Sequence, residues 1–132
     1  MIDVAAALVF HSGRLLITRR PPGKSLAGLW EFPGGKLEPG ETWEAALRRE
    51  LVEELDLTAQ VGGLYDEVIH QYPDKTIRLR FYRCTPQPGS IPRPIECSEL
   101  LWVERPDLKS HSFPAADARL LDRLGSDPSV WA

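Results

Sequence analysis

The feature that most constrains this chain is residues 31–57, EFPGGKLEPGETWEAALRRELVEELDL, in which a Gly-Gly turn precedes an acidic, amphipathic helix. On that helix Leu47, Leu51 and Leu55 repeat at intervals of four residues and form one apolar stripe. We expect the helix to run from about Thr42, a suitable N-cap residue, to Leu55. A helix with one apolar stripe must bury it against another layer, so the rest of the chain has to supply a sheet or further helices.

The rest of the chain supplies that layer mainly as strands. Apolar and β-branched runs separated by turn residues predict strands at residues 2–10, 15–18, 30–32, 57–69, 76–84 and 100–103. A second helix is expected at 113–124, and residues 125–132 are expected to form a frayed tail. Strands that alternate with two helices indicate an α/β or α+β fold in which a mixed β-sheet is sandwiched between helices. With 132 residues, the chain is expected to be a single domain, residues 1–132.

The composition argues against several classes of protein. The net charge of −3 argues against a general nucleic-acid binder, which normally carries a basic excess. No stretch approaches the ~18 apolar residues that a membrane span needs, and Asp3 stands where a signal peptide carries positive charge. Cys84 and Cys97 follow no metal-binding or redox spacing and are expected to be free thiols. We therefore expect a cytoplasmic protein that binds neither nucleic acid nor membrane. The sequence leaves its oligomeric state open.

Three acids of the helix fall close together. Glu50, Glu53 and Glu54 occupy a sector of about 100° beside the leucine stripe. Like charges at these spacings repel by a few tenths of a kcal/mol per pair, and three such carboxylates are also suitable oxygen ligands for Mg²⁺ or Mn²⁺. The helix alone leaves two interpretations open, a solvated acidic face and a divalent-metal site. The Gly34-Gly35 pair favours the metal site, because glycine lets the backbone approach a ligand and lets a carbonyl join the carboxylates.

A known motif has the same spacing. Gly35, Glu41 and the run RELVEELDL at residues 49–57 resemble the Nudix box, G-x5-E-x7-R-E-U-x-E-E-x-G-U with U aliphatic, and match eight of its nine specified positions over residues 35–57. The wider chain is similar to the MutT branch of this superfamily, in stretches such as ITRR, LWEFPGGK, YPDK and FPAAD. The one departure is Asp56 in place of the pattern's Gly. That glycine closes the helix in a left-handed conformation, which costs Asp about 1 kcal/mol.

The resemblance implies a reaction and assigns roles. Nudix enzymes of the MutT branch use Mg²⁺ or Mn²⁺ to convert a nucleoside triphosphate into the monophosphate and pyrophosphate, by attack of water at the β-phosphorus. By this resemblance the metal ligands are the Gly34 carbonyl, Glu50, Glu53, Glu54 and Glu96. Glu50 is the first choice for the general base, and Glu41 is the less favoured option. Arg49 is expected to orient Glu50 by a charge-assisted hydrogen bond.

The resemblance also places six residues at the substrate, namely Arg20, Glu31, Phe32, Pro33, Phe81 and Asp117. Arg20 is a cation and suits a phosphate, whereas Phe32 and Phe81 have rings that either stack on a base or pack in the core. In MutT proteins of the 8-oxo-dGTP type, the position that matches Asp117 is commonly Asn, whose amide both donates and accepts hydrogen bonds. An ionised Asp only accepts, so base choice is the least determined part of the prediction.

Three functions remain in competition. The leading interpretation is a pyrophosphohydrolase that removes oxidised purine nucleotides such as 8-oxo-dGTP from the nucleotide pool. The first alternative is a CTP or modified-dCTP pyrophosphohydrolase, since relatives of that type have a similar Pro-Ala-Asp segment, here Ala115-Ala116-Asp117. The second is a catalytically silent Nudix domain that only binds a nucleotide or a protein. The four acids of the motif argue against the silent domain, which has no need of mutually repelling carboxylates.

Overall fold

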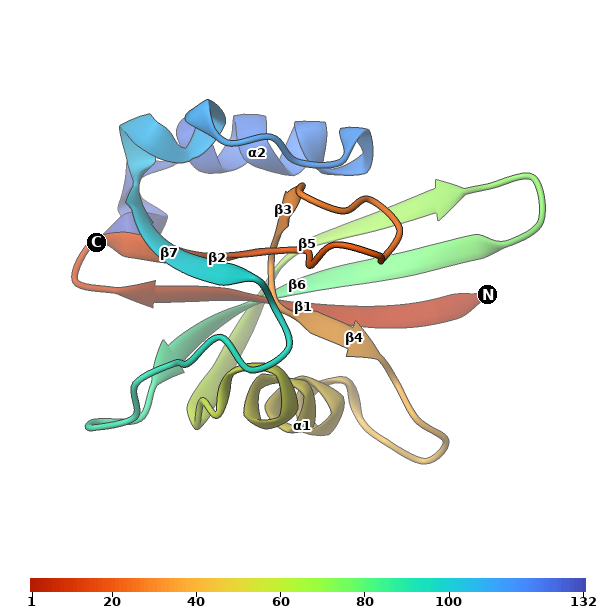
Figure 1. Ribbon diagram of the computed structural model, residues 1–132, viewed down its shortest axis with the longest axis horizontal. Coiled ribbons are helices and arrows are strands. Elements are labelled where there is room, and N and C mark those ends of the chain that lie inside the picture. The colour runs from red at the N-terminus through yellow and green to blue at the C-terminus, as the bar shows by residue number, and fades with distance from the viewer.

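The computed structural model, which describes residues 1–132, has a seven-stranded sheet with helices on both sides (Figure 1). The strands are β1 (Ile2–His11), β2 (Arg14–Arg19), β3 (Trp30–Glu31), β4 (Gly34–Lys36), β5 (Ala59–Gln71), β6 (Thr76–Pro86) and β7 (Glu99–Glu104). The α-helices are α1 (Trp43–Leu55) and α2 (Ala118–Gly125), and the 3-10 helices are η1 (Arg105–Ser110), η2 (Ala115–Asp117) and η3 (Pro128–Trp131). The predicted fold class is confirmed.

The sheet is mixed because β1 runs parallel to β6 but antiparallel to β2 and β4. Its main path is β3-β2-β1-β6-β5, with β4 paired to β1 and β7 paired to β2. β5 and β6 form a long antiparallel hairpin whose tip extends toward the end of the molecule that holds the N-terminus (Figure 1). β4 was not predicted as a strand, because its glycines carry no strand signal; it forms by pairing with the central strand β1.

Alternate residues of β1 face the two helical layers. Ala5, Ala7 and Val9 pack with the leucine stripe of α1 in one core cluster. Ala6 and Leu8 lie in a second cluster, on the side of the sheet that α2 covers. Figure 1 shows the two layers, with α1 below the sheet and α2 above it. Burial on both faces explains why the first strand is apolar throughout instead of alternating.

Helix α1 is capped at both ends as expected. Thr42 Oγ1 accepts a hydrogen bond from the Ala45 amide at 3.1 Å. At the other end Asp56 has a φ of 52°, and its amide donates to the carbonyls of Leu51 and Val52. The predicted helix and the left-handed Asp56 are therefore confirmed.

The prediction that residues 125–132 form a frayed tail is wrong. They include η3, in which Val130 and Trp131 are only 5% and 4% exposed and belong to the core on the α2 side. The Trp131 indole donates to the Leu124 carbonyl at 3.0 Å, and its ring meets Phe10 edge to face at 5.4 Å. The side chains of Val130 and Trp131 are therefore part of the core, and their burial orders residues 125–132.

The predicted start of the second helix is also wrong. Residues 113–124 do not form one helix: Phe113 and Pro114 are extended or irregular, η2 covers 115–117, and α2 begins at Ala118. Leu120 and Leu124 are fully buried and Leu121 packs against them, so the predicted inward face is confirmed.

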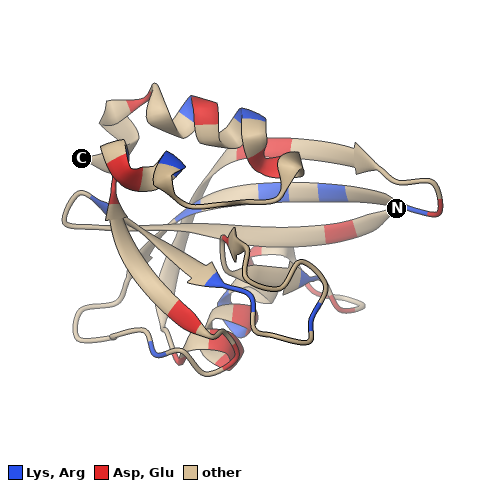
Figure 2. Ribbon diagram, turned by 45° about the horizontal axis from the view of Figure 1, so that its top comes forward, with Lys and Arg blue, Asp and Glu red and all other residues tan.

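The surface has no single dominant charge. Lys and Arg are dispersed over strands, helices and loops, interspersed with Asp and Glu (Figure 2). Both cysteines are free, Cys84 buried and Cys97 partly exposed. None of the helices is long and apolar enough to pass through a membrane.

Candidate active site

A cleft of about 360 Å³ opens beside the sheet and reaches from the Gly-Gly turn toward η2. Seven of the predicted site residues line it: Arg20, Glu31, Phe32, Gly34, Glu54, Phe81 and Asp117. They come from segments separated by up to about a hundred positions in the chain. The fold therefore brings one end of the acidic helix and five of the six predicted substrate residues into a single cleft.

Glu54 is the acid of α1 that enters this cleft. Its Oε2 accepts a hydrogen bond from the Gly34 amide at 3.1 Å, which ties the helix to the Gly-Gly turn. Burial, together with the charges of Glu50, Glu31 and Glu96, raises the pKa of Glu54 to about 8, although the hydrogen bond from Gly34 acts to lower it. A cation beside Glu54 would relieve this crowding of negative charge.

The two glycines are required by close approach. A Cβ on Gly34 would lie 2.0 Å from the carbonyl oxygen of Ala5, and a Cβ on Gly35 would lie 2.5 Å from Cδ of Glu50. Neither site has room for a side chain. The Gly-Gly turn thus lets the backbone lie directly against the carboxylates of α1, as the sequence predicts.

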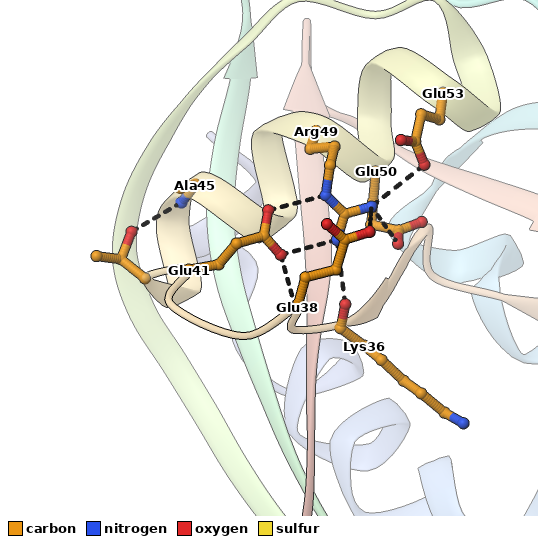
Figure 3. Close-up of polar contacts among 8 residues, drawn as sticks. Lys36, Glu38, Glu41, Ala45, Arg49, Glu50 and Glu53 are labelled. Atoms are coloured by element: carbon orange, nitrogen blue, oxygen red, sulfur yellow. Dashed lines mark hydrogen bonds and ion pairs between the residues drawn. The ribbon is translucent and has the colours of Figure 1, made fainter.

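Arg49 organises the acids outside the cleft (Figure 3). Its guanidinium holds both carboxylate oxygens of Glu41, at 2.8 and 2.9 Å. The same side chain donates to Glu50 at 3.0 Å, to Glu53 at 3.2 Å and to the Lys36 carbonyl at 3.2 Å. The predicted bond from Arg49 to Glu50 is present, and Arg49 bonds Glu41 more fully than Glu50.

Glu41 and Glu50 are in different electrostatic states. The bidentate bond from Arg49 and the bond from the Glu38 amide lower the pKa of Glu41 to about 2. Glu50 has a raised pKa, because burial outweighs its bonds to Arg49 and because Glu53 and Glu96 add negative charge. Glu41 is therefore a permanently ionised partner of Arg49, whereas Glu50 keeps a carboxylate that accepts a proton more readily.

The side chains as they stand do not yet form a metal site. No three Asp, Glu, His or Cys side chains converge in metal-binding geometry. Glu53 is half exposed on the outer side and is bonded to Arg49. Glu96, exposed on the loop before β7, is close enough to raise the pKa of both Glu50 and Glu54. The donor set of carboxylates next to a backbone turn still fits a hard divalent cation, since all its donors are oxygens.

The phosphate-binding candidate Arg20 is already paired. It donates to Glu31 at 2.9 Å and to the Ser25 carbonyl at 2.7 Å. Both Arg20 and Glu31 line the cleft. Pro33 does not: it is buried, and its carbonyl accepts from the Ala7 amide of the sheet at 2.8 Å.

The far end of the cleft holds Asp117. Its side chain is buried, and burial together with the charge of Glu31 raises its pKa to about 6, with no hydrogen bond to offset either effect. Phe32 and Phe81 are 6% and 1% exposed, and Phe113 stacks on Phe32 at 5.2 Å. Core packing is therefore the better interpretation of both rings, although both also line the cleft.

Sequence reasoning missed much of the cleft wall. Val68, His70, Tyr72, Ile77 and Leu79 of the β5–β6 hairpin line it, and so do Leu26 and Lys36. Leu26 is 54% exposed and has a φ of 59°, which is unusual for leucine. The one available signal was the alternation along 77–81, where apolar residues take every second position.

The chain is similar to known proteins over most of its length. The NUDIX domain model matches residues 4–123. The chain is 40% identical to an 8-oxo-dGTP diphosphatase of Haemophilus influenzae, over 94% of this chain and 91% of that protein. It is 34% identical to a CTP pyrophosphohydrolase of Escherichia coli, over 92% and 90%.

Solved structures give the same result. The solution structure of the E. coli ORF135 protein has a TM-score of 0.83 at 32% identity and covers 98% of this chain and 91% of that one. A MutT structure from a study of Aliivibrio salmonicida and Vibrio cholerae has a TM-score of 0.71 at 32% identity, over 96% and 98%. From its motif, its fold and these relatives, the chain belongs to the NUDIX domain family and is a MutT-like Nudix hydrolase.

Proposed function

We propose that this MutT-like nucleoside triphosphate pyrophosphohydrolase acts on an oxidised purine nucleoside triphosphate such as 8-oxo-dGTP and releases the monophosphate and pyrophosphate. The observation that carries the proposal is the single cleft that joins Glu54 and Gly34 at one end to buried Asp117 at the other. The relative from H. influenzae, an 8-oxo-dGTP diphosphatase, supports the oxidised purine. The cytoplasm, where free nucleotides are found, is the proposed location.

A divalent cation, Mg²⁺ or Mn²⁺, is part of this proposal. The residues that would hold it are Gly34, through its carbonyl, Glu50, Glu53, Glu54 and Glu96. When bound, the cation neutralises the triphosphate and lowers the pKa of the attacking water. Burial, and to a lesser degree the neighbouring carboxylates, raise the pKa of both Glu50 and Glu54, and a cation bound to them would favour their ionised forms.

The chain's own residues divide the remaining work. Glu50 accepts a proton from the attacking water, since its carboxylate is partly buried and is held by Arg49 through one oxygen only. Arg49 positions Glu50 and is itself fixed by Glu41. Arg20 exchanges part of its bond with Glu31 for a phosphate, and Glu31 is then free to accept from the sugar or base.

A CTP-type substrate is the second candidate, and one observation favours it. Asp117 accepts no hydrogen bond from the protein, so when ionised it would take one from an amino group such as that of cytosine. A neutral Asp117 would instead donate, as Asn does, and would suit the acceptor O6 of an oxidised guanine. The pKa of about 6 places both forms within reach of ordinary pH.

The test is a turnover screen with 8-oxo-dGTP, dGTP, CTP and 5-methyl-dCTP, with Mg²⁺ and with EDTA, in which the products are separated. We expect monophosphate and pyrophosphate from 8-oxo-dGTP at the highest kcat/KM, and no turnover in EDTA. A higher kcat/KM for CTP or 5-methyl-dCTP assigns the second candidate. No Mg²⁺-dependent turnover of any of the four would contradict both and would favour a silent binding domain.

A further inference from the structure

The loop that carries Glu96 is attached to the last turn of α1. The Arg93 amide donates to the Leu55 carbonyl at 2.8 Å, and the amides of Ile95 and Glu96 both donate to the Glu54 carbonyl, at 3.2 and 3.1 Å. These are carbonyls that the end of a helix leaves without partners inside the helix. The loop thus completes the helix end and at the same time brings Glu96 next to Glu54.

A side-chain contact joins the same two segments. Nη2 of Arg93 lies 3.3 Å from Oδ2 of Asp56. Asp56 occupies the position at which the Nudix box has Gly, and it is left-handed, with a φ of 52°. Gly is the easier residue for that conformation but has no side chain to reach the loop. The departure from the motif therefore introduces a bond to the segment that carries Glu96.

We infer that Asp56 and Arg93 are positioning residues that hold Glu96 at the metal site, an inference that rests on the proposed function above. Neither side chain touches the cleft, and both are exposed, at 57% and 67%, so the ion pair contributes as a surface pair does. Its effect is exerted through the loop. When the loop that carries Glu96 is already held beside α1, less ordering is required as the cation binds, and the affinity is higher.

Positioning and simple electrostatics predict opposite results for one substitution. Arg93→Gln removes a positive charge near the carboxylates, which by charge alone would strengthen cation binding, but it also releases the loop. Asp56→Asn removes a negative charge and keeps a residue that tolerates the left-handed conformation. If the pair acts by positioning, both substitutions weaken binding, and the double variant binds no more weakly than either single one.

The experiment measures Mn²⁺ binding to the full chain without nucleotide, from the electron paramagnetic resonance signal of free Mn²⁺. We expect the dissociation constant to rise about two- to fivefold in Arg93→Gln, in Asp56→Asn and in the double variant. Arg14→Gln is the matched control: it breaks an equally exposed ion pair with Glu104 and is expected to leave the constant unchanged. Asp56→Gly adds a second readout, since it is expected to raise the melting temperature while it weakens Mn²⁺ binding.

Mn²⁺ binding that is unchanged or tighter in Arg93→Gln would overturn the inference, and so would equal weakening in Arg14→Gln. Glu54→Gln separates this inference from the proposed function. If wild-type Mn²⁺ binding does not require Glu54, the metal site itself is wrong and the inference falls with it. If binding requires Glu54 but is indifferent to Arg93, only the positioning role is wrong.

Discussion

The two ends of the cleft are built in contrasting ways. At the α1 end, Glu54 in the cleft is bonded to the Gly34 amide, and just outside the cleft Arg49 bonds three glutamates and a carbonyl, so the groups are held by the protein itself. At the other end, Asp117 is buried with no hydrogen-bond partner, in a cleft whose wall includes side chains of the β5–β6 hairpin. The polar groups at the α1 end are hydrogen-bonded to one another, whereas the carboxyl of Asp117 at the other end has no hydrogen-bond partner.

We interpret this difference as a division of roles, in which the α1 end acts on the phosphates and Asp117 takes part in the choice of base. A network fixed within one short segment holds catalytic groups in place whatever base is bound, which suits a reaction at phosphate. A buried carboxyl without a partner contributes only when a ligand supplies the matching donor or acceptor, which suits the choice of base. Substitutions at the two ends should therefore differ in kind as well as in size.

The largest effect is expected from Glu50→Gln at the α1 end. The amide keeps the shape of the side chain but removes the charge needed to hold a cation and to accept a proton, so we expect kcat to fall by at least ~10³ with the fold intact. Glu44→Gln, an exposed acid in the first turn of the same helix, is the control and should retain wild-type kcat. Activity of Glu50→Gln within tenfold of wild type would show that the residue is misassigned.

The next effect concerns stability at the other end. The pKa of Asp117 is raised from its usual value to about 6, so the folded protein holds a proton that the unfolded chain releases near pH 4. The stability that this proton provides is full below pH 4 and is lost as pH rises through 6. Asp117→Asn has no such loss, so its free energy of unfolding should exceed that of wild type at pH 7.5 by on the order of 2 kcal/mol, but not at pH 3.5.

Chemical denaturation of both proteins at the two pH values measures this difference, and groups that titrate alike in both cancel. A difference that stays the same from pH 3.5 to 7.5 would mean that Asp117 is ionised without penalty in the folded protein. Asp117 would then not be the buried carboxyl without a partner that distinguishes this end of the cleft.

Glu41→Gln should have a smaller effect than Glu50→Gln. Glu41 is held on both oxygens and its pKa is about 2, so it is a poor base, and its loss acts only by loosening Arg49. We expect kcat to fall by about tenfold. A loss as large as that of Glu50→Gln, with a matching change in the pH dependence of kcat, would transfer the role of general base to Glu41.

The smallest effect is expected at the end of α1. Asp56→Gly relieves a left-handed Asp, so the free energy of unfolding should rise by up to about 1 kcal/mol, with kcat at saturating Mg²⁺ nearly unchanged. Thermal unfolding and steady-state kinetics measure the two. A lower melting temperature would show that the ion pair with Arg93 outweighs the backbone strain.

The same contrast decides how much the sequence could predict. The α1 end lies within residues 34–57, where caps, a four-residue repeat and motif spacing are all local signals, and the helix with Thr42 and Asp56 at its ends follows from them. Glu54 and Gly34 were identified for the same reason. The bond pattern of Arg49 was only partly foreseen, because its preference for Glu41 depends on how the 36–42 loop folds back.

The part of the cleft near Asp117 is formed by tertiary packing, which local sequence signals do not reveal. His70, Tyr72 and Leu26 reach the cleft because of the sheet order and a loop conformation, and neither has a signal in a single sequence. The buried Trp131 was missed in the same way, since a short segment after a helix reads as a tail unless its core partner is known. Phe32 is in the core because Phe113, about eighty residues away, covers its ring.

The most direct test of the division between chemistry and selection is kcat/KM for 8-oxo-dGTP, dGTP, CTP and 5-methyl-dCTP in the wild type, Glu50→Gln and Asp117→Asn. We expect Glu50→Gln to lower all four values by a similar factor, because it removes a group that acts on phosphate. Asp117→Asn should change the ratios between bases by roughly 1–3 kcal/mol, since a mismatched buried polar group is left unpaired. A uniform change across all four substrates in Asp117→Asn would remove Asp117 from base recognition and contradict the account.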